Sequence, residues 1–191
     1  FTGSNSVASR LAFSKGAAKE SFVQAGILTP PAVSFSAPLY TERDLTAKVK
    51  KIGFPVVVKP DAQGSSIGVT IVQNEADLGE AIGNCVAISE MGLIEKAIDG
   101  SEWTLGVIDD NPLPLIQIST DRSFFDFTAK YKDDGTGYHF DADADPTTYS
   151  RIETAGLDAC RALGTSGIAR ADIMLDSDGN PWVLEVNTIP G

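Results

Sequence analysis

The stretch from Arg170 to Gly191, RADIMLDSDGNPWVLEVNTIPG, decides the fold, because two alternating runs flank a cluster of turn-forming residues. The cluster lies between Asp176 and Pro181 and combines aspartate, serine, glycine, asparagine and proline. Such residues favour tight turns, and alternation of side chains is typical of strands. The sequence therefore predicts a β-hairpin whose loop consists of residues 177–180.

Symmetric pairing about this loop divides the hairpin into two faces. The apolar face consists of Ala171, Ile173, Leu175, Trp182, Leu184 and Val186. The polar face consists of Arg170, Asp172, Met174, Val183, Glu185 and Asn187. On the polar face, this pairing places Asp172 opposite Glu185 and Arg170 opposite Asn187. We expect the apolar face to dock on the core.

Two carboxylates that face each other across a pair of strands repel. A divalent cation offsets this repulsion, and a set of oxygen ligands from Asp172, Glu185 and Asn187 suits Mg²⁺ or Mn²⁺ better than zinc. Mg²⁺ in proteins commonly takes its remaining ligands from phosphate and water. The hairpin thus indicates a platform for metal and phosphate. The alternative, a solvated strand face whose charges are accidental, stays open from the hairpin alone.

Composition restricts the class of protein. The chain has 191 residues, of which 42% are hydrophobic and 21% are charged, as in an ordinary globular protein. Its net charge of −11 argues against nucleic-acid binding, which needs a basic surface. No apolar run is long enough for a membrane span. Cys85 and Cys160 show no metal-ligand spacing, so we expect buried thiols in a reducing, cytoplasmic setting.

The two ends of the sequence indicate whether it is a whole protein or a fragment. It begins at Phe1 without a methionine, and it stops at Gly191 directly after the hairpin. A site built around the hairpin would normally have more chain beyond it. We therefore expect a fragment of a longer protein.

Periodicity predicts an α+β protein. The helical patterns span residues 6–24, 41–52, 75–89 and 147–163. The strand patterns outside the hairpin span residues 54–59, 69–72, 93–98, 102–108 and 113–119. Gly16 weakens the first helical pattern, which suggests two short helices that meet near Ser14, and Thr41 is a helix cap. This order of elements predicts two α+β lobes, residues 1–99 and 100–191, that meet near Asp99 and Gly100.

One loop has the composition of a phosphate cradle. Lys59 ends a buried strand, Pro60 breaks that strand, and the loop that follows contains Gly64, Ser65, Ser66 and Gly68. Glycines permit close approach of a phosphate, and the serines add hydroxyl donors. The spacing is not that of a Walker A loop. A flexible hairpin tip beside a snorkelling lysine is the plain alternative.

Other charged residues carry weaker signals. Lys15 near a helix start can reach an anion, although a solvated surface lysine is the commoner case. Glu95 and Lys96 lie near the expected junction of the lobes, where main-chain groups of residues 96–98 can read an adenine edge and Glu102 can bind ribose hydroxyls. An edge-strand ion pair between Glu95 and Lys96 is the alternative.

The polar stretch at residues 120–148 is too long for an ordinary connection and is typical of a functional lid or of a disordered segment. A cation there, Lys130 beside Tyr131, can meet phosphates when a lid closes. His139 is the only histidine and lies in this stretch, where we expect a loop residue and not a catalyst. Arg170 can hold an oxyanion or a phosphate, with an ion pair to Asp172 as the alternative.

Five segments in order resemble the D-alanine–D-alanine ligases of the ATP-grasp superfamily. They are FSK at Lys15, VVVKPDAQGSSIGV, LIEKAIDGSEWTL, FFDFTAKY and GIARADIMLDSDGNPWVLEVNTIPG. The resemblance implies the α+β ATP-grasp fold, whose two lobes grip nucleotide between antiparallel sheets. It also implies that an amino-terminal domain and a segment after Gly191 are missing.

The resemblance assigns roles to residues by their place in these segments. Residues that match the ATP-binding positions are Lys15, Lys59, Ser65, Ser66, Glu95, Lys96, Ile98, Glu102 and Lys130. Asp172, Glu185 and Asn187 match the ligands of two Mg²⁺ or Mn²⁺ ions. Residues that match the groups around the reacting atoms are Arg170, Ser65, Tyr131 and Gly191. Arg170 and Gly191 hold the tetrahedral oxyanion in that family.

The reaction that the resemblance implies joins two D-alanines. ATP phosphorylates the first carboxylate, and the amine of the second D-alanine displaces phosphate. The resemblance further implies a cytoplasmic enzyme of peptidoglycan synthesis, with ATP and D-alanine as partners and a homodimer as the whole protein. Tyr131 favours an amine nucleophile over D-lactate, whereas Gln63, Phe125 and Phe127 depart from common family residues.

Two other functions compete with this one. The first is a related ligase that uses D-serine, D-lactate or L-amino acids. The second is a nucleotide-binding module that has lost catalysis, although the basic and acidic residues that catalysis would need are present.

Overall fold

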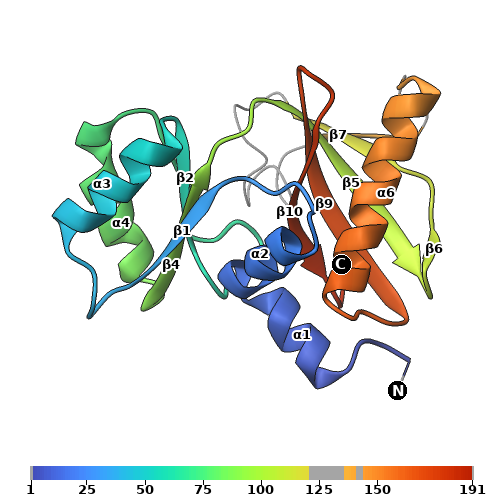
Figure 1. Cartoon of the computed structure of the whole chain (residues 1–191), viewed down its shortest axis with the longest axis horizontal. Helices are drawn as coiled ribbons and strands as arrows, with labels where there is room; N and C mark the ends of the chain where they lie inside the picture. Colours follow the sequence, from blue (N-terminus) through green and yellow to red (C-terminus); the bar gives the residue numbers. More distant parts are fainter. Residues whose placement is uncertain (1, 121–135, 141–143, 191) are drawn as a thin grey trace. The chain divides into compact units, whose positions relative to one another are not determined.

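The computed structural model describes residues 2–120, 136–140 and 144–190. The chain forms two compact units, each with its own antiparallel sheet (Figure 1). One unit contains the chain up to Thr29 and the described residues from Ile98 onward. The described part of the other unit runs from Pro30 to Ala97.

The larger sheet contains the predicted hairpin. Its strands are β5 (Gly100–Ile108), β6 (Asn111–Pro112), β7 (Ile116–Thr120), β8 (Thr136–His139), β9 (Ile168–Asp176) and β10 (Pro181–Asn187). The order is β10-β9-β5-β7-β8, with β6 paired to β5, so β10 is an end strand. The loop between β9 and β10 is the predicted one, residues 177–180.

Helices cover one face of this sheet. Helix α6 (Pro146–Ala162) packs against β5, β9 and β10 and appears in front of them in Figure 1. Helices α1 (Ser6–Phe13) and α2 (Lys15–Gln24) pack against β10. The buried core of the unit includes Phe22, Trp103, Leu105, Leu115, Ile152, Ala171, Ile173, Val183 and Val186. The apolar side of the hairpin therefore docks on the core, as expected.

The smaller unit is a four-stranded sheet covered by two helices. Its strands are β1 (Ala32–Ser36), β2 (Val56–Pro60), β3 (Thr70–Val72) and β4 (Met91–Lys96), in the order β1-β4-β2-β3. Helix α3 (Glu42–Ile52), the short helix η1 (Glu75–Asp77) and helix α4 (Leu78–Val86) follow the predicted segments. Val56, Val58 and Ile94 pack under α3 and α4 in one core. Because side chains alternate along a strand, Lys59 and Glu95 lie on the opposite face of the sheet.

Local start and stop signals explain the helix boundaries. The first helical pattern is two helices, because the Ser14 side chain accepts a hydrogen bond from the Ala17 N–H and so caps α2. Thr41 caps α3 in the same way, and Gly53 at φ 83° ends it. The predicted break near Ser14 and the predicted cap at Thr41 are both confirmed.

The hairpin register is confirmed near the polar residues and wrong near the loop. Asp172 pairs with Glu185, and Arg170 pairs with Asn187, as predicted. A β-bulge between Val183 and Glu185 then shifts the register by one residue. Val183 is consequently buried on the core face, whereas Trp182 pairs with Met174 on the polar face, opposite to prediction.

Three further expectations differ from the structure. Pro60 is the last residue of β2 and does not break it. His139 lies in β8, where its Nε2 is 2.7 Å from Ser119 Oγ, and not in a loop. Residues 2–29 belong to the unit of β10, so that unit is not limited to residues 100–191; the change of unit after Ala97 lies close to the expected junction.

Among the described residues, no helix is both long and apolar enough to cross a membrane. Cys85 and Cys160 are buried free thiols, as expected. Burial raises the pKa of each thiol to about 11.

Candidate functional site

The polar face of the hairpin is built around Asp172. The Asp172 residue is only 6% exposed, although it lies on the face that α6 does not cover. The Oδ1 atom accepts hydrogen bonds from Thr104 Oγ1 at 2.8 Å and from Arg170 Nε at 2.8 Å. The Oδ2 atom accepts from Arg170 Nη2 at 2.8 Å and from Asn187 Nδ2 at 3.1 Å. A solvated strand face with accidental charges does not fit this burial.

Arg170 and Asp172 form a two-pronged ion pair. The Nε and Nη2 atoms of one guanidinium reach both oxygens of the carboxylate. Such paired bonds are stronger and more directional than a single contact. The ion pair that the sequence left as an alternative is therefore present, and it holds the guanidinium in one orientation at the hairpin.

Glu185 meets a cation from the amino-terminal helices. Lys15 Nζ lies 3.3 Å from Glu185 Oε2, and the two side chains are 11% and 26% exposed. Lys15 is the first residue of α2, whose N-terminal end carries partial positive charge that favours a nearby carboxylate. The structure thus brings Lys15 to the acidic pair and does not leave it as a solvated surface lysine.

Sequence reasoning missed Thr104. It pairs with Asp172 across β5 and β9 and donates to its carboxylate. Glu102, the predicted ribose ligand, shares the same face of β5, because it lies two residues before Thr104. No pattern in the sequence identifies Thr104, since the register of β5 against β9 depends on strands far apart in the chain.

The donor set fits a hard divalent cation. Asp172 and Glu185 contribute carboxylate oxygens, and Asn187 donates through its amide nitrogen to Asp172, so its side-chain oxygen is not used in that bond. No histidine or cysteine joins them, which suits Mg²⁺ or Mn²⁺. Over the described ranges, no group of three or more histidine, cysteine, aspartate or glutamate side chains is assembled for a metal. The predicted metal ligands differ from such a group, because they are two carboxylates and one amide.

The other unit buries a second ion pair. Lys59 Nζ donates to Glu95 Oε1, and the two residues are 7% and 3% exposed. Lys59 therefore does not snorkel into solvent. The alternative of an edge-strand pair between Glu95 and Lys96 is also wrong, because β4 is an inner strand and Lys96 Nζ donates to the carbonyls of Gly53 and Phe54.

The segment after β4 is fixed by main-chain bonds. The N–H groups of Lys96 and Ala97 donate to the carbonyls of Pro31 and Pro55. These two N–H groups are used inside their own unit and are not the groups that would meet the predicted adenine edge. Ile98 is half-buried.

The backbone of the serine loop is sharply turned. Ser65 and Ser66 both lie at φ 55°, and Gly68 lies at φ 73°. Positive φ is uncommon for residues other than glycine and often marks functional loops. The Ile67 N–H donates to the Gly64 carbonyl and the Val69 N–H donates to the Ser66 carbonyl, so the loop consists of tight turns. Lys130, Tyr131 and Gly191 lie outside the described residues.

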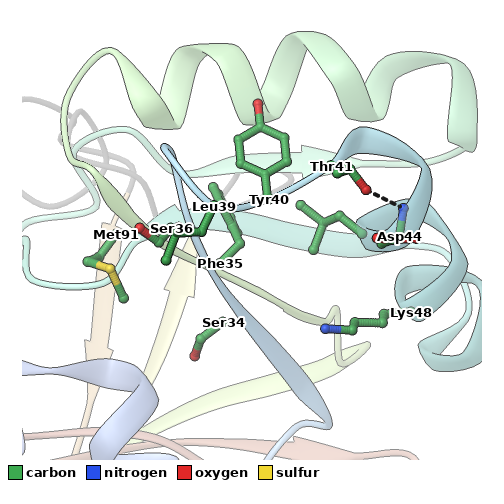
Figure 2. A pocket seen from close by; sticks show the side chains of 10 residues that line it. Ser34, Phe35, Ser36, Leu39, Tyr40, Thr41, Asp44, Lys48 and Met91 are labelled. Atoms are coloured by element: carbon green, nitrogen blue, oxygen red, sulfur yellow. Dashed lines mark hydrogen bonds between the residues drawn. The ribbon is translucent and has the colours of Figure 1, made fainter.

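A hollow of about 360 Å³ lies in the unit of residues 30–97. Figure 2 shows Leu39, Tyr40 and Met91 at its rim, with Asp44 and Lys48 from α3. None of the predicted site residues is among those that line it. We therefore assign no role in the reaction to this hollow.

Comparisons with known proteins point to one family. Residues 22–191 match the family model described as D-ala D-ala ligase C-terminus. The whole chain aligns with the D-alanine–D-alanine ligases of Methylococcus capsulatus, at 38% identity, and Marinobacter nauticus, at 39% identity. The chain covers 60% and 58% of these relatives, or about three fifths of their length.

Solved structures show the same architecture over the whole chain. The D-alanine–D-alanine ligase of Bacillus anthracis superposes with a TM-score of 0.87 at 35% identity, and 61% of that chain is covered. The VanG D-Ala:D-Ser ligase of Enterococcus faecalis superposes with a TM-score of 0.84 at 30% identity, and 56% of that chain is covered. A complex of the Bacillus anthracis enzyme with ATP gives a TM-score of 0.85 at 31% identity, with 59% of that chain covered.

Proposed function

Since the chain belongs to the D-alanine–D-alanine ligase family and has its ATP-grasp fold, we propose that the whole protein joins two D-alanines at the expense of ATP. The product, D-alanyl-D-alanine, serves peptidoglycan synthesis. The observation that carries this proposal is the buried Asp172 facing Glu185, with Arg170, Asn187 and Lys15 in contact with the pair.

We propose that Asp172, Glu185 and Asn187 hold two Mg²⁺ or Mn²⁺ ions. Bound there, the ions neutralise charge on the transferring phosphoryl group. Thr104 and Arg170 fix the orientation of the Asp172 carboxylate, as outer contacts of metal ligands commonly do. Lys15 adds a cation beside Glu185, where a phosphate would approach.

The residues that we propose to bind ATP are those that match the family's nucleotide ligands. The proposed phosphate ligands are Lys15, Lys59, Ser65, Ser66 and Lys130. The proposed adenine and ribose ligands are Glu95, Lys96, Ile98 and Glu102. The buried contact of Lys59 with Glu95 and the positive φ values of the serine loop support these roles, because both fix the groups before a ligand arrives.

Arg170 is the proposed partner of the tetrahedral oxyanion, together with Gly191. The two bonds to Asp172 employ two of the five guanidinium N–H groups and set the plane of the fork. A fixed guanidinium stabilises charge that develops in the transition state without reorganising. Ser65 and Tyr131 are the further residues that we propose to act around the reacting atoms.

Ligation of D-alanine to D-serine is a second candidate. The likeness to the D-Ala:D-Ser ligase of Enterococcus faecalis over the whole chain favours it. The two activities differ in the second substrate, so an assay separates them.

The test incubates the full-length protein with ATP, Mg²⁺ and D-alanine, and measures phosphate release and dipeptide by chromatography. Parallel reactions replace the second substrate with D-serine or D-lactate, or replace both with L-alanine. We expect D-alanyl-D-alanine as the main product. Activity with L-alanine alone would overturn the substrate assignment, and ATP binding without phosphate release would indicate a non-catalytic nucleotide-binding module.

We also propose that the whole protein is a cytoplasmic homodimer. The two free, buried thiols suit a reducing compartment. Light scattering coupled to size exclusion measures the mass, and a monomer at working concentration would contradict the dimer.

A further inference from the structure

The outer edge of β10 is held by a segment far away in sequence. The Val183 N–H donates to the Leu28 carbonyl at 2.9 Å, and the Val183 carbonyl accepts from Thr29 Oγ1 at 2.8 Å. β10 is the end strand of its sheet, so these main-chain groups would otherwise face away from any strand. Residues 28 and 29 thus secure β10 at one position, Val183.

That position is where the bulge begins. Val183 pairs with Ile173, and the next paired residue is Glu185, opposite Asp172. Without the extra residue, Leu184 would lie opposite Asp172, and Glu185 would move to the core face. A carboxylate on the core face is unfavourable, and the acidic pair would not exist. With Val183 paired to Ile173, the bulge therefore decides that Glu185 belongs to the polar face.

The Thr29 hydroxyl is itself held by a buried ammonium group. Lys19 Nζ donates to Thr29 Oγ1 at 2.7 Å, and the two residues are 4% and 8% exposed. The hydroxyl has one hydrogen, which it gives to the Val183 carbonyl, and it accepts from Lys19. A charged donor polarises the hydroxyl and strengthens the bond that it donates.

Helix α2 contacts the hairpin on both sides of the bulge. Lys15 reaches Glu185 beyond the bulge, and Lys19, one helical turn later, reaches Val183 before it through Thr29. Residues four apart lie on the same side of a helix. One face of α2 therefore fixes both the start of the bulge and the carboxylate that follows it.

We infer that Lys19 and Thr29 are positioning residues for the metal site. They hold the bulge that aligns Glu185 with Asp172, and they act through it. The inference rests on the proposed function in that it takes Glu185 as a metal ligand. We call the contacts of Lys19 with Thr29 and of Thr29 with Val183 the bulge clamp.

The test compares Thr29→Val, which has nearly the same shape but no hydroxyl, with Thr29→Ser, which keeps the hydroxyl. Mn²⁺ binding in the presence of saturating ATP, without D-alanine, is followed by water-proton relaxation on the full-length protein. We expect Thr29→Val to weaken Mn²⁺ binding roughly tenfold, as changes in outer contacts of metal ligands do. Thr29→Ser should restore the wild-type affinity.

Hydrogen exchange provides a readout that does not depend on metal. In Thr29→Val the amides of residues 182–186 should exchange faster, while those of β5 keep their wild-type protection. Lys19→Met should behave as Thr29→Val does. Phe22→Leu is the matched control: Phe22 is buried on the same helix, so the substitution destabilises the unit but removes none of the hydrogen-bonding groups of the bulge clamp.

The possible outcomes distinguish failure of the bulge clamp from failure of the proposed metal site. Wild-type Mn²⁺ affinity and wild-type exchange in Thr29→Val would overturn the bulge clamp. An equal loss of Mn²⁺ affinity in Phe22→Leu would also overturn it, since general destabilisation would then suffice. Absence of Mn²⁺ binding to the wild type would instead overturn the proposed metal site.

Discussion

Thr104 of β5 donates a 2.8 Å hydrogen bond to the Asp172 carboxylate of β9, and both residues are buried. The bond crosses from β5 to β9, the first strand of the hairpin. It adds a neutral donor to a carboxylate that Arg170 and Asn187 also contact. Thr104 therefore takes part in holding Asp172 in one orientation.

Thr104→Val should destabilise the protein, because it removes a donor from a buried carboxylate. We expect a loss of about 1.5–3 kcal/mol in the free energy of unfolding, measured by urea denaturation. Thr104→Ser keeps the hydroxyl and is the control. If the valine and serine variants are equally stable, the hydrogen bond does not contribute.

Glu185→Gln should lower the affinity for Mn²⁺ with ATP while the fold survives. Glutamine keeps the shape of the side chain but removes its negative charge. That charge contacts Lys15, and we propose that it binds the metal. The loss should exceed the roughly tenfold effect typical of outer contacts. Glu80→Gln, at an exposed position of α4, controls for the change in net charge. Unchanged dependence on Mg²⁺ in Glu185→Gln would count against the metal assignment.

Lys59→Met should be strongly destabilising, because it leaves the Glu95 carboxylate buried without its main cation. Breaking a buried ion pair costs about 3–5 kcal/mol, whereas an exposed pair contributes at most about 1 kcal/mol. Lys50→Met, which breaks the exposed pair with Glu75, is the matched control. Urea denaturation measures both.

The double variant Lys59→Met, Glu95→Met tests the cause of that loss. Removing both charges should recover much of the stability, since no unpaired charge remains buried. Additive losses in the double variant would show that Lys59 stabilises the unit by another route.

Asp176 makes stability depend on pH at the hairpin loop. Hydrogen bonds, first from the Trp182 indole and then from the Asn180 N–H, lower the pKa of its carboxyl from 3.8 to about 2. Between these values the unfolded chain binds more protons than the folded one, so stability falls as the pH falls through this window. Above about pH 5 the contribution is complete.

Asp176→Asn should therefore be less stable than the wild type at neutral pH, and the difference should shrink as the pH falls from about 4 to about 2. Urea midpoints over this range measure the effect. A difference that stays constant with pH would show that the carboxylate charge is not the cause.

The two thiols should be unreactive in the folded protein. Burial raises the pKa of Cys85 and Cys160 to about 11, so little thiolate forms near pH 8. A chromogenic disulfide reagent should titrate both thiols in urea and neither in buffer. Rapid reaction in buffer would contradict the burial of at least one of them.

Much of the fold follows from short-range signals in the sequence. Turn formers predicted the loop at residues 177–180, and alternation predicted the opposition of Asp172 and Glu185. Gly16 predicted the break near Ser14, and the cap at Thr41 predicted the start of α3. The loop, the break and the cap depend on residues close together in the chain, whereas the opposition of Asp172 and Glu185 also depends on the bulge.

The tertiary structure decided what depends on distant segments. The bulge at Val183 is secured by Leu28 and Thr29, which are more than a hundred positions away. The partner of Asp172 on β5, Thr104, likewise follows from a pairing of strands that no local pattern encodes. The same holds for the docking of residues 2–29 beside β10. Alternation gives each side chain a face within its own strand, but only contacts between remote segments decide where that alternation is interrupted and which groups then meet.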